Sequence, residues 1–357
     1  MKILHIPQRR FALRKAISGI KTVLLEEIKW ENKIEGIESK ILIYDKIEES
    51  NILFINKISI KEDILNYKPD FIIFDGFWTI QHYFIAKFLK KNKIKYYIKP
   101  HGAFNKIAQR NSRIKFIKKL VARILFFDRY VKNSEGLIFL NETEKQNSIY
   151  RSKNEFILPN GIEKKDFNLN FVNETEKIKF IFLGRIDIFH KGIDVLLETL
   201  LKNKEYLIKN KIVFNFYGKG RKKDMTIFNQ YLNKIPQIVK YKGVVYGEEK
   251  YKVLQDNDIF ILTSRFEGMP MGVLEALDSG LPCFITRETG MGEYVKRYRC
   301  GWEVSNIDNL EQEFKNFIAE YTKNKEIYIQ NTQKCKEKFL WNKLIKLYLK
   351  EYKKMKS

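Results

Sequence analysis

Two glutamates enclose the part of the sequence best suited to hold a ligand. Glu267 and Glu275 are separated by seven residues, a glycine-containing turn that leads into an apolar helix, and the buried strand Ile259–Ser264 precedes them. In a doubly wound sheet, ligands bind beyond the carboxyl ends of the strands and against helix N-termini. We therefore expect a phosphate to meet three free backbone N–H groups, those of Met271, Gly272 and Val273. The two carboxylates would accept hydrogen bonds from hydroxyl groups on either side, which describes a nucleotide sugar.

Two cations follow an earlier strand and precede a helix, in the segment Leu183–Gly192. Arg185 can form paired hydrogen bonds with phosphate oxygens, and Lys191 can add a point charge. Each charge-assisted bond is worth roughly 1.5–3 kcal/mol where water is excluded. Both could instead be solvated loop charges in a lysine-rich chain. Their position at a strand end, together with the glutamates downstream, favours the binding role.

Three further strand ends carry candidate ligand contacts. His101, followed by a glycine, can donate to a sugar hydroxyl, although single histidines are more often structural. Glycine pairs let a ligand approach the backbone, although each pair also suits an ordinary turn. The pairs are Gly218 with Gly220 and Gly290 with Gly292. Gly184, next to Arg185 in the segment Leu183–Gly192, is a further candidate contact. Asp256 and Asp258 resemble a metal-binding pair, but they begin a buried strand without a third ligand nearby, so we expect no metal.

The segment Ala86–Asn133 holds fifteen Lys or Arg residues and a single acid, Asp128. Within it, apolar residues such as Ile117, Val121 and Ile124 fall on one helical arc and cations fall on the other. A basic amphipathic helix suits an anionic bilayer surface, but it can equally be a core helix with a solvated back. We expect the apolar arc to pack inward and these cations to face a membrane: Lys115, Lys118, Lys119 and Arg123.

The composition sets the broad class of protein. The chain has 357 residues, enough for two domains, and a formal net charge of +24. A basic excess favours polyanionic partners or an anionic membrane surface. Three cysteines without paired spacing argue for a reducing compartment and against a disulfide framework or zinc site. No apolar stretch reaches membrane-spanning length, and the first residues are typical of a strand rather than a signal peptide, so we expect a cytoplasmic protein.

Apolar strands alternate with helices along both halves of the sequence, which predicts an α/β fold with parallel sheets covered on both faces. The strands expected in the first half are Lys2–Ile6, Lys40–Tyr44, Phe71–Asp75, Lys95–Lys99, Gly136–Leu140 and Phe156–Leu158. Asn160-Gly161 is a strong turn pattern and marks a domain boundary. The strands expected beyond it are Lys179–Leu183, Val213–Tyr217, Val239–Tyr241, Ile259–Leu262 and Cys283–Thr286. The tail Gln333–Lys356 is expected to be one amphipathic helix.

These motifs together resemble glycosyltransferase family four. The resemblance is densest over Leu158–Val304, where it includes Gly184-Arg185, Lys191-Gly192 and the segment Glu267–Pro282. It implies a GT-B fold, in which two Rossmann-like domains enclose a cleft, with retaining chemistry and neither metal nor other cofactor. The implied domains are an acceptor-side domain at 1–161 and a nucleotide-sugar-binding domain at 162–337. A final helix at about 338–357 would return to the first domain.

The resemblance also implies roles for individual residues. Arg185 and Lys191 would bind the donor diphosphate and stabilise the leaving nucleotide, while Glu275 would accept hydrogen bonds from the ribose. Glu267 and His101 would contact the donor sugar, and the acceptor would attack from the face that the diphosphate leaves. The loop 7–19 departs from the family pattern, because it is basic and lacks adjacent glycines. Acceptor contacts therefore cannot be assigned there.

The sequence thus predicts a hexosyltransferase that moves a sugar from a nucleotide diphosphate, with UDP expected, to a lipid-linked glycan of a surface polysaccharide. We expect it to be peripheral on the inner face of the cell membrane. A nucleotide-sugar 2-epimerase of the same fold is an alternative that would turn over donor without acceptor. A nucleic-acid-binding module is another, but it would interleave aromatic side chains with the basic surface, which this basic run does not.

Overall fold

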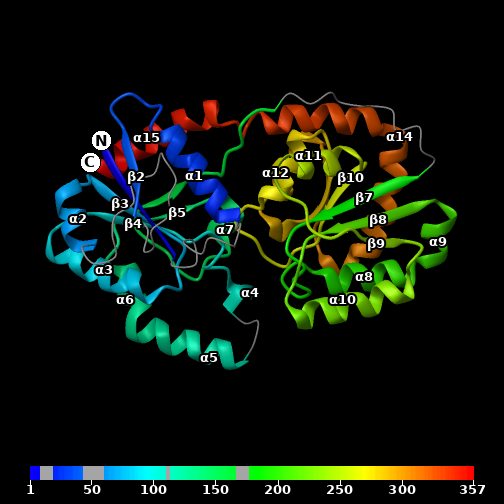
Figure 1. Ribbon diagram of the computed structural model, residues 1–357, viewed down its shortest axis with the longest axis horizontal. Coiled ribbons are helices and arrows are strands. Elements are labelled where there is room, and N and C mark those ends of the chain that lie inside the picture. The colour runs from blue at the N-terminus through cyan, green and yellow to red at the C-terminus, as the bar shows by residue number, and fades with distance from the viewer. Residues whose placement is uncertain (9–18, 43–59, 110–112, 166–176) are drawn as a thin grey trace. The chain divides into compact units, whose positions relative to one another are not determined.

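The computed structural model describes residues 1–8, 19–42, 60–109, 113–165 and 177–357. The side chains of residues 19, 20 and 113–115 lie outside this description. The chain forms two compact units (Figure 1). Unit 1 comprises Met1–Gly161 and Leu340–Ser357, and unit 2 comprises Ile162–Phe339.

Unit 1 is built on a six-stranded parallel sheet with the strand order β2-β1-β3-β4-β5-β6. Its strands are β1 (Lys2–Pro7), β2 (Glu38–Ile41), β3 (Phe71–Asp75), β4 (Tyr96–Lys99), β5 (Gly136–Phe139) and β6 (Glu155–Ile157). All residues of β3, β4 and β5 are buried, as expected for parallel strands covered on both faces. The order in which the chain adds strands to the sheet reverses between β1 and β3. The loops that follow these two strands therefore lead away from each other.

Helices cover both faces of this sheet. They are α1 (Gly19–Glu31), α2 (Ile60–Tyr67), α3 (Ile80–Lys91), α4 (Lys106–Gln109), α5 (Arg113–Ala122), the π-helical turn η2 (Arg123–Phe127), α6 (Asp128–Lys132), α7 (Glu142–Gln146) and α15 (Trp341–Lys356). Alternate residues of β3 enter different cores, because successive strand side chains point to opposite faces. Ile72 and Phe74 join the core beneath α3 and α6, whereas Phe71 and Ile73 join the core built around α15.

Unit 2 repeats the arrangement with the strand order β12-β11-β10-β7-β8-β9, again fully parallel. Its strands are β7 (Ile178–Leu183), β8 (Ile212–Tyr217), β9 (Val239–Tyr241), β10 (Ile259–Leu262), β11 (Cys283–Thr286) and β12 (Gly301–Val304). Its helices are α8 (Ile193–Lys202), α9 (Lys204–Lys209), α10 (Lys222–Lys234), α11 (Gly247–Gln255), α12 (Met271–Asp278), α13 (Gly292–Tyr298) and α14 (Leu310–Lys336), with short 3-10 turns at 287–289 and 307–309. The direction of winding reverses between β7 and β10, which is where ligands bind in this class of fold.

The α/β prediction is confirmed, and most of the expected strands form within a residue or two of their predicted bounds. β2 begins two residues before the predicted strand, whose last two residues lie outside the described part. Strand β12 was not predicted, because Gly301–Val304 is short and carries Glu303 in its middle. The single tail helix is wrong: α14 ends at Lys336 and α15 starts at Trp341. No helix in the described residues is long and apolar enough to span a bilayer.

Trp341, which packs the start of α15 into the core of unit 1, allows a prediction about stability. Trp341 is fully buried, and its indole lies so close to Gly161 that a Cβ there would be 2.4 Å from the ring. Trp341→Ala should lower the free energy of unfolding of unit 1 by about 3–5 kcal/mol, because it leaves a cavity in a close-packed core. Chemical denaturation followed by circular dichroism measures this. Leu65→Ala, at a side chain that is 43% exposed in the same unit, should change it by less than about 0.5 kcal/mol. Equal effects of the two variants would contradict the assignment.

Candidate functional site

The loops after β7 and β10 meet at the winding reversal of unit 2. Gly192 adopts a φ of 62°, and a Cβ on it would lie 2.0 Å from the carbonyl oxygen of Thr263. The hydroxyl of Thr263 in turn donates to the carbonyl groups of Lys191 and Gly192, at 3.2 Å each. A side chain at position 192 would therefore push the two loops apart. Their close contact brings Lys191 next to the residues that follow β10.

Lys191 and Glu267 form an ion pair at this point, with 2.6 Å between Nζ and Oε1. The hydroxyl of Ser264 donates to the same carboxylate oxygen at 2.7 Å. The two charged side chains are only 14% and 12% exposed, so water screens their attraction weakly. Glu267 is further held by its backbone N–H, which donates to the carbonyl of Glu288. The pair therefore has a defined geometry, and Lys191 retains N–H donors for a ligand.

His190 is a site residue that the sequence reading did not select. Its ring stacks on Phe266 with the centroids 4.1 Å apart, and its Nε2–H donates to the carbonyl of Phe266 at 2.8 Å. Burial is the main cause that lowers the pKa of His190, and Glu267 opposes it. A neutral ring with the proton on Nε2 leaves Nδ1 as an acceptor, and Nδ1 lies 3.0 Å from Nη2 of Arg185. His190 therefore orients the guanidinium of Arg185.

Burial and the neighbouring charges act in opposite directions on Glu267. Burial is the largest influence and would raise the pKa of its carboxyl group, but the ammonium of Lys191 and the hydrogen bond from Ser264 outweigh it and lower the pKa. Arg185, by contrast, is 61% exposed and lies 3.4 Å from Asp187. The site thus combines one partly buried ammonium, one buried carboxylate and one accessible guanidinium at the same edge of the sheet.

Glu275 lies on α12 and pairs with Lys250 of α11, with 2.6 Å between Nζ and Oε1. Burial is the main cause that raises the pKa of the Glu275 carboxyl group, and Lys250 opposes it. Lys250 was absent from the sequence prediction, because only the fold brings this residue of α11 next to Glu275 of α12. The ammonium makes it possible to bury a carboxylate at this position.

The start of α12 corrects one expectation. The backbone N–H of Val273 donates to the carbonyl of Pro270 at 3.1 Å, so the prediction of three free N–H groups is wrong for this residue. Met271 and Gly272 already belong to the first turn of the helix, which begins at Met271. A Cβ on Gly272 would lie 3.1 Å from the ring of Phe260 and 3.3 Å from the carbonyl oxygen of Leu183, so this turn packs tightly against β7 and β10.

The paired glycines of unit 2 have structural explanations of their own. Gly218 has a φ of 137°, and a Cβ on it would lie 1.8 Å from the carbonyl oxygen of Gly184. Gly220 would similarly place a Cβ 2.2 Å from the carbonyl oxygen of Ile186. These contacts hold the loops after β7 and β8 together, whether or not a ligand also lies there. The other predicted pair, Gly290 and Gly292, precedes and begins α13.

In unit 1, His101 is positioned by a buried carboxylate. It has a φ of 50°, a left-handed conformation that is uncommon outside glycine, and its side chain is only 4% exposed. Nε2 lies 2.9 Å from Oδ1 of Asp75 at the end of β3. The next residue, Gly102, donates its N–H to the buried carboxylate of Glu144. The backbone conformation and both carboxylates therefore fix the imidazole.

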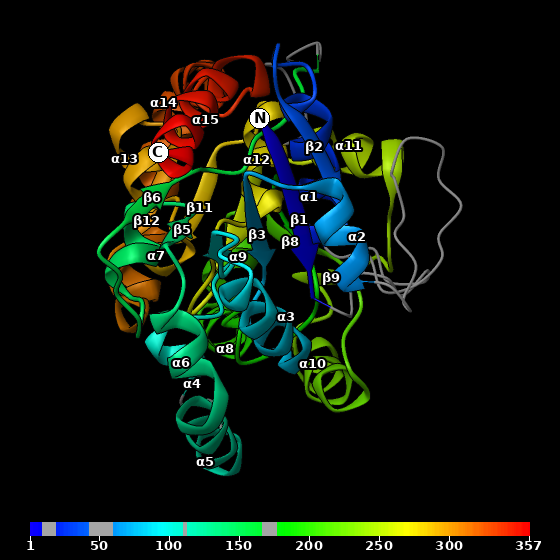
Figure 2. The ribbon, with the colours of Figure 1, turned by 90° about the vertical axis from the view of Figure 1, so that its left-hand side faces the viewer.

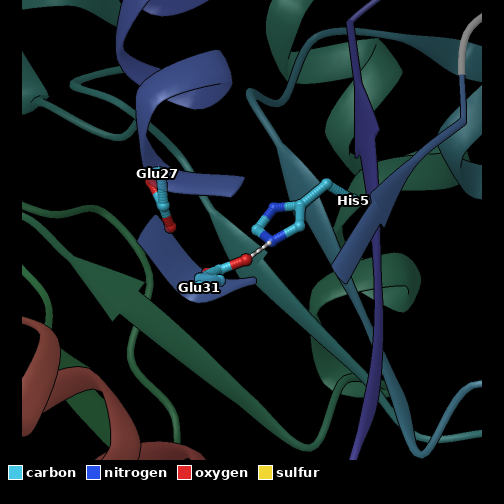
Figure 3. A group of neighbouring side chains, drawn as sticks. All are labelled: His5, Glu27 and Glu31. Atoms are coloured by element: carbon cyan, nitrogen blue, oxygen red, sulfur yellow. Dashed lines mark hydrogen bonds and ion pairs between the residues drawn. The ribbon is translucent and has the colours of Figure 1, made fainter. Parts of the chain in front are cut away.

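Asp75 belongs to a larger network of buried charges. Its second oxygen, Oδ2, lies 2.9 Å from Nδ1 of His5, and Nε2 of His5 lies 3.2 Å from Glu31 (Figure 3). Tyr352 of α15 donates to the other oxygen of Glu31. Burial, the largest single influence, would lower the pKa of His5, but Glu31 and Asp75 together raise it to about 10. His5 is therefore an imidazolium that bridges two carboxylates.

In the described part of the chain, His5, Glu27 and Glu31 form a group whose geometry could hold a metal ion (Figure 3). However, both oxygens of Glu27 accept hydrogen bonds from the ammonium of Lys99, at 2.8 and 2.6 Å. The two nitrogens of His5 are also engaged. A metal would have to displace Lys99 and the proton of His5, so the donor set fits a charge-balanced network better than a metal site.

The basic helix is oriented opposite to the prediction. Lys119 donates to the carbonyl of Ala108 at 3.0 Å and lies over the ring of Trp78. Arg123 contacts Asp128 and the hydroxyl of Tyr150, at 3.3 and 3.2 Å. These two cations therefore face their own unit, and the apolar residues that were expected to pack inward are exposed. Lys118 is exposed as predicted, and the side chain of Lys115 lies outside the described residues.

Two doubly wound units in one chain are the architecture of the GT-B class of glycosyltransferase folds. Residues 163–335, nearly all of unit 2, match the family described as "Glycosyl transferases group 1". Unit 2 is therefore similar to this family over nearly its whole length.

Solved structures of similar fold cover the whole chain. TarM has a TM-score of 0.74 at 13% identity, covering 100% of this chain and 98% of that one. Anabaena HepE, in complex with UDP and glucose, has a TM-score of 0.72 at 12% identity, covering 99% and 100%. The lipopolysaccharide outer core galactosyltransferase WaaB has a TM-score of 0.71 at 17% identity, covering 98% of each chain. At these identities the similarity establishes the fold alone.

Curated relatives are more similar in sequence but align over varying lengths. The Escherichia coli "UDP-Gal:alpha-D-GlcNAc-diphosphoundecaprenol alpha-1,3-galactosyltransferase" is 25% identical over 197 residues, 52% of this chain and 49% of that protein. The match thus spans about half the length of this relative. The uncharacterized glycosyltransferase MJ1178 of Methanocaldococcus jannaschii is 24% identical over 340 residues, 88% of this chain and 89% of that protein.

The positive charge of His5 predicts how the stability of the protein depends on pH. Because its pKa rises from 6.5 on folding to about 10, its stabilising contribution is fully present below pH 6.5 and disappears as the pH rises through 10. The difference in unfolding free energy between the wild type and His5→Phe should therefore shrink from pH 7 to pH 10. Urea denaturation across this range measures it. His82→Phe is the control: burial lowers the pKa of His82 to about 4, so its effect should stay nearly constant. A constant effect of His5→Phe would show that His5 is neutral.

Proposed function

We propose that this protein is a retaining glycosyltransferase that moves a sugar from a nucleotide diphosphate, UDP, to a lipid-linked glycan in surface polysaccharide biosynthesis. The observation that carries the proposal is the Lys191–Glu267 pair beside Arg185 at the winding reversal of unit 2. A diphosphate needs cations there, and a sugar needs a fixed acceptor of hydroxyl protons. The E. coli relative supports the substrates, since its name specifies a UDP-sugar donor and a diphosphoundecaprenol-linked acceptor.

In this mechanism, Arg185 and Lys191 stabilise the negative charge that grows on the diphosphate as the sugar–phosphate bond breaks. Fixed charges act strongly where they are in place before the reaction and partly shielded from water. Lys191 meets both conditions, because its side chain is only 14% exposed and is held by Glu267, which Ser264 holds in turn. Arg185 is more exposed, but His190 orients it in advance. Side-chain cations thus take the role that a divalent metal has in other transferases, and the proposed reaction is independent of metal and of other cofactors.

The carboxylates recognise hydroxyl groups. Glu275 would accept hydrogen bonds from the ribose while Lys250 balances its charge, and Glu267 would bind hydroxyls of the donor sugar. A retained anomeric configuration requires no carboxylate nucleophile if the acceptor attacks from the face that the diphosphate leaves. Glu267, which is ion-paired and already accepts from Ser264, suits binding rather than attack.

The proposed acceptor places the protein in the cytoplasm, peripheral on the inner face of the cell membrane. Its partners would be the nucleotide-diphosphate sugar, the lipid-linked glycan and an anionic membrane surface, and not nucleic acid. The net charge of +24 supports attraction to anionic lipid.

Binding of UDP tests the donor and the metal independence together. The wild type should bind UDP in excess EDTA, and Glu275→Ala should weaken binding by roughly 1.5–3 kcal/mol, because hydrogen bonds to a charged group are lost. Calorimetric titration measures both. Glu275→Gln, which preserves the size of the side chain, separates loss of charge from misfolding, and Glu311→Ala on an exposed turn of α14 is the control. Loss of wild-type binding in EDTA would refute metal independence, and unchanged affinity in Glu275→Ala would remove Glu275 from the site.

Lys191→Ala and Arg185→Ala should act on turnover. Each should lower the rate at saturating donor by about 100- to 1000-fold, as expected when a group that stabilises developing charge is removed. The assay is release of UDP with a lipid-linked acceptor or, in its absence, by donor hydrolysis. Lys209→Ala, at an exposed lysine of the same unit, should leave the rate unchanged. A change in KM alone would show that the two cations bind substrate and transition state equally.

A further inference from the structure

Six large apolar side chains are exposed on α5 and η2. They are Phe116, Ile117, Leu120, Val121, Ile124 and Leu125, and their exposed fractions range from 39% to 67%. We call these residues the apolar stripe. Single exposed apolar residues are normal on protein surfaces, but a contiguous set on one element marks an interaction site.

The opposite side of the same helix is attached to unit 1. Lys119 donates to the Ala108 carbonyl and lies over Trp78, and Arg123 contacts Asp128 and Tyr150. With a helical period of about 3.6 residues, positions 119 and 123 share one face, so positions 117, 121 and 124 lie on the other. Both views of the chain show α5 at the outer edge of its unit, beyond α6 and away from the sheet (Figures 1 and 2). The stripe is therefore presented outward.

The exposed cations on α5 and its neighbouring elements form no ion pair with an acid among the described residues. Exposed basic residues occur on α5 itself and on the elements beside it, namely Lys87, Lys106, Lys118, Arg129 and Lys132. Asp128, the single acid between Ala86 and Asn133, already accepts hydrogen bonds from Arg123 and from the hydroxyl of Tyr150. The neighbouring helix α3 adds Phe84, which is 58% exposed. The surface thus combines exposed apolar side chains with uncompensated positive charge.

We propose that the apolar stripe inserts into the interfacial layer of an anionic bilayer, while the surrounding cations contact lipid phosphates. An interfacial helix buries its apolar face about 5–10 Å into the boundary between headgroups and acyl chains. A second copy of the chain fits less well, because two such surfaces would bring like charges together. Nucleic acid would satisfy the cations but leave the aliphatic side chains in water. This inference rests on the proposed lipid-linked acceptor. It differs from the sequence-based expectation, in which the cations of the helix, and not its apolar side chains, face the membrane.

Vesicle co-sedimentation tests the insertion. The probe is a vesicle of phosphatidylglycerol and phosphatidylcholine, and the test variant is Ile117→Ser with Ile124→Ser. Partitioning should fall at least about tenfold, because the buried apolar area shrinks. The matched control is Ile208→Ser with Ile327→Ser, at positions of unit 2 that are 48% and 49% exposed, and it should bind as the wild type does. The double variant Lys118→Gln with Arg129→Gln should weaken binding most at low salt, since screening removes the electrostatic part.

A spectroscopic readout separates insertion from surface adsorption. The emission of a tryptophan introduced as Ile124→Trp should shift to the blue when vesicles are added, whereas one introduced as Ile327→Trp should not. No wild-type binding at low salt, equal binding of the stripe variant, or an unshifted Ile124→Trp emission would each overturn the proposal. Self-association that the stripe variant abolishes, without vesicle binding, would identify a second copy as the occupant and overturn it as well.

The same variants keep this inference separate from the proposed function. The stripe variant should retain UDP binding and donor hydrolysis, because its changes lie outside the donor site, and it should lose transfer only to an acceptor embedded in vesicles. Vesicle binding without any UDP binding would leave the membrane surface in place and reject the transferase. UDP binding without vesicle binding would do the reverse.

Discussion

Burial of charged side chains at the ends of the parallel strands is the constraint on which the rest of this structure depends. A buried ion is stable only when a counter-ion and hydrogen-bond partners accompany it. Unit 1 satisfies this with Lys99–Glu27 and with His5 between Asp75 and Glu31. Unit 2 satisfies it with Lys191–Glu267 and Lys250–Glu275. Charges of both signs are thereby held rigidly at the sheet edges where this fold binds ligands.

The two units use this constraint differently. In unit 1 the network is almost completely enclosed and extends to Tyr352 of α15, so the C-terminal helix contributes to positioning His101 through Glu31, His5 and Asp75. In unit 2 the Lys191–Glu267 pair is connected through His190 to Arg185, whose side chain is exposed. A charge network that only positions a side chain, as in unit 1, can be buried completely. A network proposed to bind an anion, as in unit 2, must leave a cation accessible to solvent.

Much of the fold could be predicted because its physical causes are local. Continuous apolar strands such as Phe71–Asp75 and Ile259–Leu262 can be stable only inside a covered parallel sheet, so their runs in the sequence predicted both the strands and the architecture. The short strand β12 and the break between α14 and α15 were missed, because each depends on what packs against it. Gly301, for instance, fits because a Cβ would lie 2.0 Å from the carbonyl oxygen of Cys283.

The sequence by itself determined the two-unit α/β fold and the segments after β7 and β10 that carry Arg185, Lys191, Glu267 and Glu275, because strand periodicity and turn residues act over a few positions. Only the tertiary structure decided the partners of these side chains. Lys191 and Lys250 approach Glu267 and Glu275 from other parts of the chain, as Asp75 approaches His101, and no spacing in the sequence reveals such contacts. It also decided the orientation of α5. An amphipathic pattern shows that a helix has two faces, but the contacts of Lys119 and Arg123 determine which face is turned to solvent.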